Sequence, residues 1–376
     1  MKRVQNRAIL LNFLHFLALH ASRPYLSLLI GDLGGGRMET GFILSLYSAI
    51  QIPAALPVGR WIARRGCCWP VRWGGAAFLT GTVLLTAARD LWMTGMASVL
   101  LGLGHSLILL SAQHIVTGVP EPDARARAVG WLSFFNSAGV FLGPLAGGYL
   151  QDVLGRNPGF LGAVVLSAAA MAAGAGLPGR SEERGDAQTS FKACFCLNKV
   201  VWSEVAMSGT VFFTTDILAA YLPLYGTELG WSSTLAGALL SANGLAQMAV
   251  RPFLGRLCAR RPARQVLRCC LLAGGVFLAC LGWSGPFWLL MAASAASGCA
   301  VGLANPLTLL TVSASAGEEE RSQALALRVM ANYAGQSLSP VLFGAVAAGL
   351  GLGAVFWCGG GVLLLCSWVV GRRSEL

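Results

Sequence analysis

Apolar runs of about twenty residues alternate along the chain with short connectors that are rich in Gly, Pro and charged residues. A helix of roughly 20 apolar residues is long enough to cross the hydrocarbon layer of a bilayer. Such a segment must satisfy its own backbone hydrogen bonds, so each run is predicted to be an α-helix. We predict twelve spans, at residues 8–30, 39–58, 71–88, 91–117, 127–150, 158–178, 199–224, 231–253, 265–284, 286–314, 322–349 and 351–371.

The longest polar connector separates these spans into two sets of six. It covers residues 180–198, and its part from Phe191 to Leu197 is expected to form a short surface helix. The predicted organisation is therefore an N-terminal six-helix bundle at residues 1–179, a cytoplasmic linker at 180–198 and a C-terminal six-helix bundle at 199–376.

The basic residues predict the orientation of the chain. If the N-terminus is cytoplasmic, most of the 27 Lys and Arg residues fall in cytoplasmic connectors. Only Arg37, Arg89 and Arg156 then lie in connectors on the opposite side. Positive charge accumulates in cytoplasmic loops of membrane proteins, so we expect both termini inside the cell.

The two halves repeat each other at a fixed offset of 196 positions. The stretch from Gly59 to Arg65 follows the second span, and the similar stretch from Gly255 to Arg261 follows the eighth. At the same offset Gln51 matches Gln247, Arg125 matches Arg321, Asn136 matches Asn332, Gly139 matches Gly335 and Pro144 matches Pro340. One register that aligns loops and spans together favours two parallel, pseudo-symmetric bundles related by an axis along the membrane normal.

The fifth span carries a glycine pattern of unusual density. Gly139, Gly143 and Gly147 are four residues apart and so share one face of a helix, followed by Gly148. Small residues on one face let two membrane helices approach closely. Pro144 removes a backbone donor in mid-helix, which a membrane helix tolerates where its neighbours cover the break. The pattern by itself predicts a tight helix–helix seam.

The full sequence Gly-x-x-x-Gly-Pro-x-x-Gly-Gly resembles the fifth-helix antiporter motif of exporters in the major facilitator superfamily. The loop from Gly59 resembles the family's Gly-x-x-x-Asp-Arg-x-Gly motif, except that Ala63 and, in the second copy, Ala259 replace the aspartate. The resemblance implies an all-α membrane protein with the twelve-helix fold of that family, and an exporter of the drug or metabolite:proton antiporter type. It also implies gating or motif roles for a set of glycines, arginines and one proline: Gly59, Arg60, Arg64, Arg65, Arg125, Gly139, Gly143, Pro144, Gly147, Gly148, Arg251, Arg256 and Arg260. For most of these arginines the alternative is that they only set the topology of the chain in the membrane.

Composition narrows the class of protein further. Hydrophobic residues make up 55% of the 376 residues and charged residues 11%, against about 25% charged in a soluble domain. The net charge of +11 lies in short clusters between apolar runs, so we expect a lipid bilayer rather than nucleic acid as the partner. We expect a multi-pass protein of the bacterial plasma (inner) membrane, acting as a monomer, with its thiols buried and facing a reducing cytoplasm.

Polar side chains inside spans are the candidates for transport, because they are costly in a membrane. His15, His20 and Arg23 lie on one broad face of the first span, and the repeat places Asp216 of the seventh span opposite His20. We predict proton coupling through Asp216 and His20, and substrate contacts at Arg23; a structural role for Asp216 as the partner of Arg23 or of His20 is the alternative.

Other intramembrane polar residues complete the candidate substrate site. In the family that the chain resembles, the cavity is lined mainly by spans 1, 2, 4, 5, 7, 8, 10 and 11. The candidates are Arg23, His20, His15, Gln51, His105, Gln113, Asn136, Asn243, Gln247, Asn305, Arg328, Asn332 and Gln336. Three intramembrane arginines favour an anionic or zwitterionic substrate, or else they line a vestibule without touching it.

The energy source and the substrate are constrained mainly by what the sequence lacks. No Gly-x-x-x-x-Gly-Lys-Ser/Thr loop is present, no constellation of catalytic groups is visible, and neither the four histidines nor Cys194 and Cys196 show metal-ligand spacing. We therefore expect a transporter rather than an enzyme, with no metal site and no cofactor, driven by a proton gradient. Export of a small amphiphilic or anionic compound, multidrug efflux of lipophilic compounds, export of an opine-type metallophore and proton-coupled uptake of an organic anion all remain open.

Overall fold

A computed structural model describes residues 2–118, 121–177, 198–316 and 321–373. The first half contains α1 (Lys2–Asp32), α2 (Arg37–Ala49), α3 (Gln51–Arg65), α4 (Cys68–Ala87), α5 (Leu91–Thr117), α6 (Pro122–Leu154), the 3-10 helix η1 (Pro158–Phe160) and α7 (Leu161–Gly174). The second half contains α8 (Lys199–Glu228), α9 (Ser233–Val250), the 3-10 helix η3 (Arg251–Phe253), α10 (Leu254–Arg260), α11 (Ala263–Cys280), α12 (Phe287–Ser315), α13 (Arg321–Leu350) and α14 (Leu352–Arg373).

The all-α class is confirmed, and each predicted span coincides with one helix or with two consecutive ones. The second span is divided at Ile50 into α2 and α3, and the eighth continues from α9 into η3. Six stretches within the described residues are long and apolar enough to cross a membrane: α5, residues 127–154 of α6, α8, α11, α12 and residues 352–372 of α14. The full number of spans and their orientation stay predictions.

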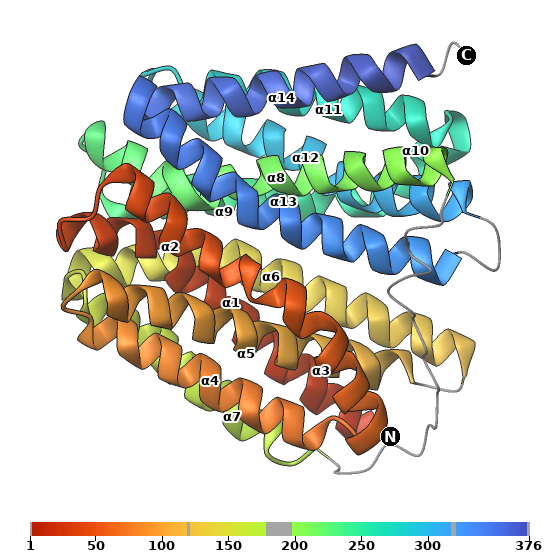
Figure 1. Cartoon of the computed structure of the whole chain (residues 1–376), viewed down its shortest axis with the longest axis horizontal. Coiled ribbons are helices and arrows are strands. Elements are labelled where there is room, and N and C mark those ends of the chain that lie inside the picture. The colour runs from red at the N-terminus through yellow and green to blue at the C-terminus, as the bar shows by residue number, and fades with distance from the viewer. Residues whose placement is uncertain (1, 119–120, 178–197, 317–320, 374–376) are drawn as a thin grey trace.

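Figure 1 shows two groups of helices side by side: α1 to α7 form the lower group, and α8 to α14 form the upper one. Both chain ends lie at the same end of the molecule, which we call the terminal end. The opposite end, where α1 ends at Asp32 and α9 begins at Ser233, is called the distal end. The predicted surface helix, Cys194, Cys196 and all of the predicted linker except Asn198 lie outside the described residues.

The glycine face of α6 packs directly on α1. A Cβ atom added at Gly139 would lie 2.8 Å from the Cβ of Phe16, and one at Gly143 would lie 2.6 Å from the Cβ of His20. Real Cβ atoms do not approach other atoms this closely, so only glycine fits at these positions. The spacing of four residues therefore brings two helix backbones together, as small residues do in membranes.

Contacts between the two halves are concentrated toward the distal end. Helix α6 packs on α9, and α13 packs on α2 but barely touches α3, which continues α2 toward the terminal end. Gly148 of α6 faces the carbonyl of Ser233, and Gly344 of α13 faces the carbonyl of Arg37. The halves are thus closely joined at the distal end.

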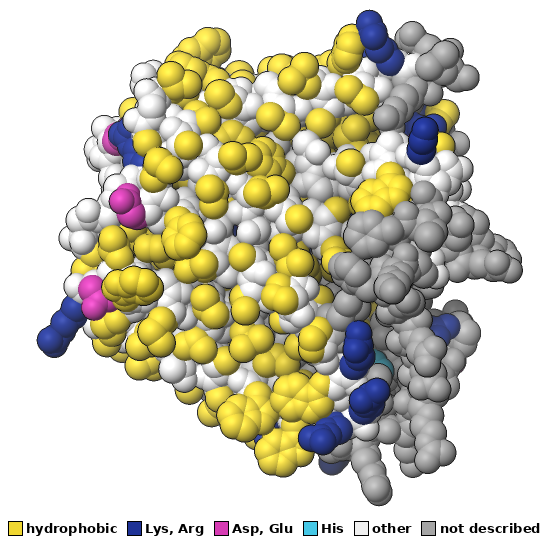
Figure 2. All heavy atoms as spheres, in the orientation of Figure 1, with side chains coloured by type: hydrophobic (Ala, Val, Ile, Leu, Met, Phe, Trp, Pro, Cys, Tyr) yellow, Lys and Arg dark blue, Asp and Glu magenta, His cyan; other side chains and the backbone are white. Residues whose placement is uncertain are grey.

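The surface fits a membrane environment. Hydrophobic side chains cover the middle of the face in Figure 2, and charged side chains gather toward its two ends. The expectation of buried thiols is only partly right, because Cys269, Cys299 and Cys358 are exposed. Cys67, between α3 and α4, is buried, and its burial raises the pKa of its thiol to about 12.

Candidate functional site

The two halves meet in a buried ion pair between their first helices. Arg23 of α1 donates two hydrogen bonds to Asp216 of α8, with Nη2 2.6 Å from Oδ2 and Nη1 3.2 Å from Oδ1. The two side chains are 13% and 9% exposed. The Arg23 guanidinium also lies 4.3 Å from the ring centroid of Tyr47 on α2. Two parallel hydrogen bonds hold both groups in one geometry and neutralise both charges.

The polar face of α1 is divided among several neighbouring helices. Asn12 donates to the side-chain oxygen of Asn136 on α6, and Arg23 turns to α8. His15 is buried within the first half, with its Nε2 2.9 Å from Nδ1 of His105 and its ring against Phe78 of α4. His15 therefore contacts helices of its own bundle, whereas Arg23 contacts the opposite half, and a role of His15 in binding substrate stays a prediction.

His20 and His105 lie nearer to the Arg23–Asp216 pair. His20 is half-buried beside Phe16, and His105 faces the rings of Phe16 and Tyr47. The Tyr47 ring therefore contacts both His105 and the Arg23 guanidinium. Sequence reasoning passed over Tyr47, although the 196-residue offset pairs it with Asn243, one of the candidates.

The candidates Gln51 and Gln247 each form a hydrogen bond within the second span of their own half. Gln51 is buried and donates to the carbonyl of Tyr47 at 3.0 Å. Gln247 donates to Asn243 at 2.8 Å, and Asn243 in turn donates to the carbonyl of Ser294 on α12 at 2.8 Å. The equivalent glutamines of the repeat therefore make different contacts.

A polar cluster lies inside the second half, between α8, α12 and α13. Ser208 Oγ lies 2.8 Å from the side-chain amide of Asn332 and 3.2 Å from Thr308 Oγ1. Arg328, one turn before Asn332, donates to the Asn305 carbonyl at 3.0 Å and to Thr308 Oγ1 at 3.1 Å. The structure thus brings together Asn305, Arg328 and Asn332 of the candidate list.

The remaining candidates lie nearer the surface. Arg251 is exposed and donates to Ser137 of α6 at 2.6 Å, a contact between the halves. Gln113 is exposed and Gln336 is half-buried. The loop arginines are exposed, and no ion pair found within the described ranges includes them: Arg60, Arg64, Arg65, Arg125, Arg256 and Arg260. Their arrangement fits a topology-setting role.

Two tyrosines that sequence reasoning missed make equivalent contacts in the two halves. Tyr25 of α1 donates to the carbonyl of Pro144 on α6, and Tyr221 of α8 donates to the carbonyl of Pro340 on α13. A Cβ on Gly237 would collide with the first of these carbonyls, and one on Gly41 with the second. The signal was present in the sequence, because the tyrosines are themselves 196 residues apart.

The distal end is closed by different polar groups at its two interfaces. Asp152 of α6 accepts from the backbone N–H groups of Ser233 and Thr234, at 2.9 and 2.8 Å, where α9 begins. A carboxylate at a helix N-terminus is favourable because it satisfies free N–H groups and opposes the helix dipole. At the other interface Arg37 of α2 pairs with Glu228 and donates to the carbonyl of Ala347 at 2.7 Å.

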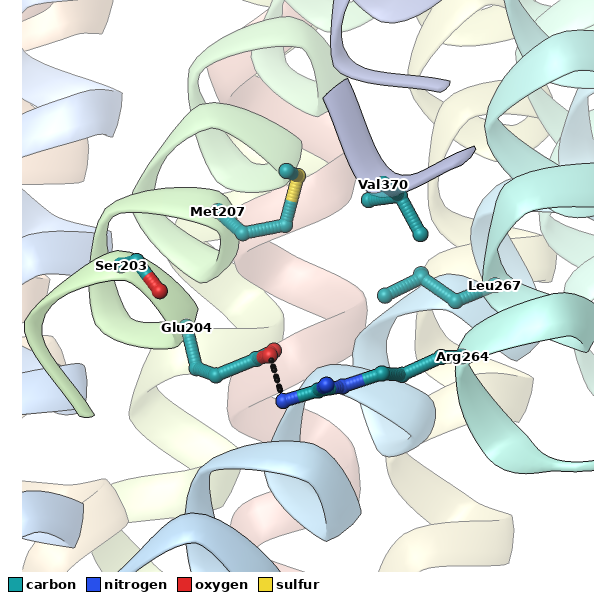
Figure 3. A pocket seen from close by; sticks show the side chains of 6 residues that line it. All are labelled: Ser203, Glu204, Met207, Arg264, Leu267 and Val370. Atoms are coloured by element: carbon teal, nitrogen blue, oxygen red, sulfur yellow. Dashed lines mark ion pairs between the residues drawn. The ribbon is translucent and has the colours of Figure 1, made fainter. Parts of the chain in front are cut away.

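One small pocket lies away from this central region. Figure 3 shows it between α8, α11 and α14, lined by Glu204, Arg264, Met207 and three further side chains. Glu204 is buried and pairs with Arg264 at 2.8 Å, so the charged groups of this pocket satisfy each other. The pocket belongs to the second half alone and does not include the Arg23–Asp216 pair.

Comparisons with known proteins agree on family and fold. Residues 8–232 and 205–375 match the model of the Major Facilitator Superfamily. The multidrug resistance protein MdtG of Salmonella choleraesuis is 26% identical over 94% of this chain and 91% of its own length. Multidrug resistance protein 1 of Bacillus subtilis is 24% identical over 42% of this chain and 41% of its own. The solved structure of the nucleoside transporter NupG superimposes with a TM-score of 0.84, at 13% identity over 98% of this chain and 99% of its own.

Proposed function

Because the chain belongs to the major facilitator superfamily and is therefore a membrane transporter rather than an enzyme, we propose that it exports a small amphiphilic organic compound in exchange for protons. The export direction is supported by the fifth-helix motif and by distant relatives that are named as multidrug resistance proteins. We place the protein in a bacterial plasma membrane with both termini cytoplasmic.

The Arg23–Asp216 ion pair carries this proposal. It joins α1 and α8, which belong to different halves, and both of its side chains are largely removed from water. Protonation of Asp216 removes one charge of the pair and leaves Arg23 without its counter-ion. Breaking a buried ion pair in this way costs several kcal/mol, on the order of 3–5. A proton on Asp216 would therefore loosen a contact on which the relative position of the halves depends.

The same geometry supports a proposal of alternating access. We propose that residues 1–179 and 199–376 rock against each other around the central ion pair. The close contacts of α6 with α9 and of α2 with α13 belong to a state closed at the distal end. With the termini cytoplasmic, this state faces inward. Substrate would load with Asp216 ionised, and the carrier would return with Asp216 protonated.

Uptake of an organic anion together with a proton is the second candidate. Arg328 is buried, and within the described ranges no ion pair includes it. When a proton neutralises Asp216, Arg23 loses its counter-charge, and an anion held in the same interior would be attracted to it. Proton and anion would then favour the same state, which is the thermodynamic condition for cotransport.

Vesicles containing the purified protein test both candidates. Tetraphenylphosphonium, a lipophilic cation, and N-dansyl-leucine, a lipophilic acid, serve as probes under an imposed pH jump, with internal pH followed by a trapped dye. Export predicts proton movement opposite to the probe, and uptake predicts movement in the same direction. Asp216→Asn should abolish proton movement while probe exchange at equal pH persists.

Glu204→Gln is the matched control, because Glu204 is a buried carboxylate paired with an arginine outside the central region. Normal coupling in Asp216→Asn, or equal loss in both variants, would remove Asp216 from the mechanism.

A further inference from the structure

Among the residues that the structure describes, Arg328 is a buried cation without a carboxylate partner. Its residue is 9% exposed, and its Nη2 donates to the Asn305 carbonyl and to Thr308 Oγ1. By contrast, Arg23 has Asp216 and Arg264 has Glu204. None of the ion pairs within the described ranges includes Arg328. Burying a charge without a counter-charge is costly, so an anion bound here would recover part of that cost.

The internal repeat indicates that the fold does not require this cation. At the 196-residue offset Arg328 corresponds to Leu132 and Asn305 to Leu109. Leu132 is buried in the first half, where an apolar side chain fills the equivalent helix position. In contrast, Ser208 and Asn332 correspond to Asn12 and Asn136, which also contact each other across their bundle. The polar contact between the first and fifth spans of a half is therefore common to both halves. Arg328 and Asn305 have apolar equivalents in the first half and are polar only in the second.

Two buried atoms of this group have no hydrogen-bond partner in the described part of the chain. Arg328 Nε is a donor and Asn305 Oδ1 is an acceptor, and both are inaccessible to water. Unpaired buried groups are rare in native structures, because each of them keeps the cost of leaving water without gaining a partner. A ligand that satisfied both would present an acceptor to Arg328 and a donor to Asn305. A carboxylate with an N–H or O–H group close to it has this combination.

The neighbouring contacts hold the two residues in place. Thr308 accepts from Arg328 and lies 3.2 Å from Ser208 Oγ, which in turn lies 2.8 Å from the Asn332 amide. Side chains from α8, α12 and α13 therefore order the guanidinium before any ligand arrives. Such preorganisation favours binding, because less side-chain freedom is lost in the complex.

We propose that Arg328 and Asn305 bind the carboxylate end of an amphiphilic organic acid that carries an N–H or O–H group next to the acid. Arg328 takes the carboxylate through Nε, and Asn305 Oδ1 accepts from the adjacent donor. This assignment names the substrate class of the proposed transport function, on which it rests in either direction of transport. It places the acid in the second half and leaves Arg23 to its partner Asp216.

Equilibrium binding to the purified full-length protein in detergent tests the assignment. The probes are N-dansyl-leucine, its carboxamide, which lacks the charge, and its N-methyl derivative, which lacks the donor. The wild-type protein should bind the acid at least about tenfold more tightly than the carboxamide, which corresponds to about 1.4 kcal/mol. The N-methyl acid should bind with intermediate affinity. Inorganic phosphate alone should not compete, and competition by phosphate would identify a general anion site and overturn the proposal.

Arg328→Leu is the decisive variant, because leucine is the residue of the equivalent position in the first half. It should bind acid and carboxamide equally, with the affinity for the carboxamide unchanged and a wild-type melting profile. Asn305→Leu should remove only the difference between the acid and its N-methyl derivative. If wild-type protein shows no preference for the acid, or if Arg328→Leu keeps that preference, the assignment is wrong.

Arg251→Leu provides the matched control, because Arg251 is also an arginine of the second half but is exposed and bound to Ser137. It should keep the preference for the acid, and a loss as large as that of Arg328→Leu would indicate a general electrostatic effect and overturn the assignment. Binding is measured without a proton gradient. A failure of proton exchange in vesicles would therefore count against the proposed function and leave the acid site standing.

Discussion

The α6–α9 and α2–α13 interfaces occupy equivalent positions in the repeat, yet they are alike only at their centres. At each interface, a tyrosine in the first span of one half donates to the carbonyl of a proline in the fifth span of the same half. A glycine of the opposite half passes close to that carbonyl. At the distal end one interface is closed by Asp152 and the other by Arg37 with Glu228. The repeat thus preserves the close backbone contact, while the polar groups around it differ.

This difference separates the contacts that the two interfaces share from those that each interface makes in its own way. Close backbone approach leaves no room for another side chain, so it constrains both copies in the same way. Polar contacts at the rim are partly exposed and can be made by several combinations of groups. Substitutions at the glycines should therefore affect both interfaces alike, and substitutions at the rim should affect them unequally.

Gly41→Ala and Gly237→Ala should have the largest effect. The new Cβ would lie 2.1 Å from the Pro340 carbonyl in the first variant and 2.4 Å from the Pro144 carbonyl in the second. Crowding of this kind typically costs about 1–3 kcal/mol, and the distal ends should separate. Thermal unfolding in detergent and amide exchange at the start of α2 and α9 measure both effects. Gly361→Ala is the control, because no neighbouring helix in the described part of the chain comes within 4 Å of its added Cβ.

Asp152→Ala should come next, and should affect only one interface. The equivalent residue of the second half is Ala348, so the substitution makes the two rims alike at this position. Loss of a side chain that caps a helix N-terminus costs about 0.5–2 kcal/mol. The amides of Ser233 and Thr234 should exchange faster, while the first turn of α2 should not change. Equal acceleration at both helices would show that Asp152 does not act locally.

Tyr25→Phe and Tyr221→Phe test whether the central contacts are equivalent. Each substitution removes one hydroxyl donor to a proline carbonyl and leaves the ring in place. A single hydrogen bond of this kind contributes about 0.5–1.5 kcal/mol, so both variants should melt slightly earlier and by similar amounts. A large loss in only one variant would mean that the repeat does not carry the same energetics at its two interfaces.

Arg37→Gln should have the smallest effect. The Arg37 and Glu228 side chains are 38% and 44% exposed, and exposed ion pairs contribute about 0–1 kcal/mol. A double-mutant cycle with Glu228→Gln should give a small coupling energy that shrinks further at high salt. A coupling above about 2 kcal/mol would show that this rim is as important to distal closure as the glycine contacts.

Local patterns in the sequence were sufficient for much of the fold. The apolar runs predicted helices whose bounds in the structure differ from the predicted spans mostly by a few residues, and α5 at Leu91–Thr117 coincides with its predicted span. The four-residue spacing of glycines predicted a seam on α6, but could not name α1 as its partner. For the candidate site, the sequence selected Arg23 and Asp216 and named their pairing only as one alternative. It did not anticipate Tyr47 over Arg23, or His15 turned toward His105.

The sequence by itself determined the helical class, the internal repeat and the set of polar residues available inside the spans. These properties depend on composition and on periodicities of a few residues, which any stretch of chain carries without its partners. Only the tertiary structure decided that Arg23 meets Asp216, 193 residues away, and that Arg328 meets no carboxylate among the residues it describes. Such contacts depend on how each helix is rotated and shifted against its neighbours, and that arrangement is set by the packing of the whole bundle.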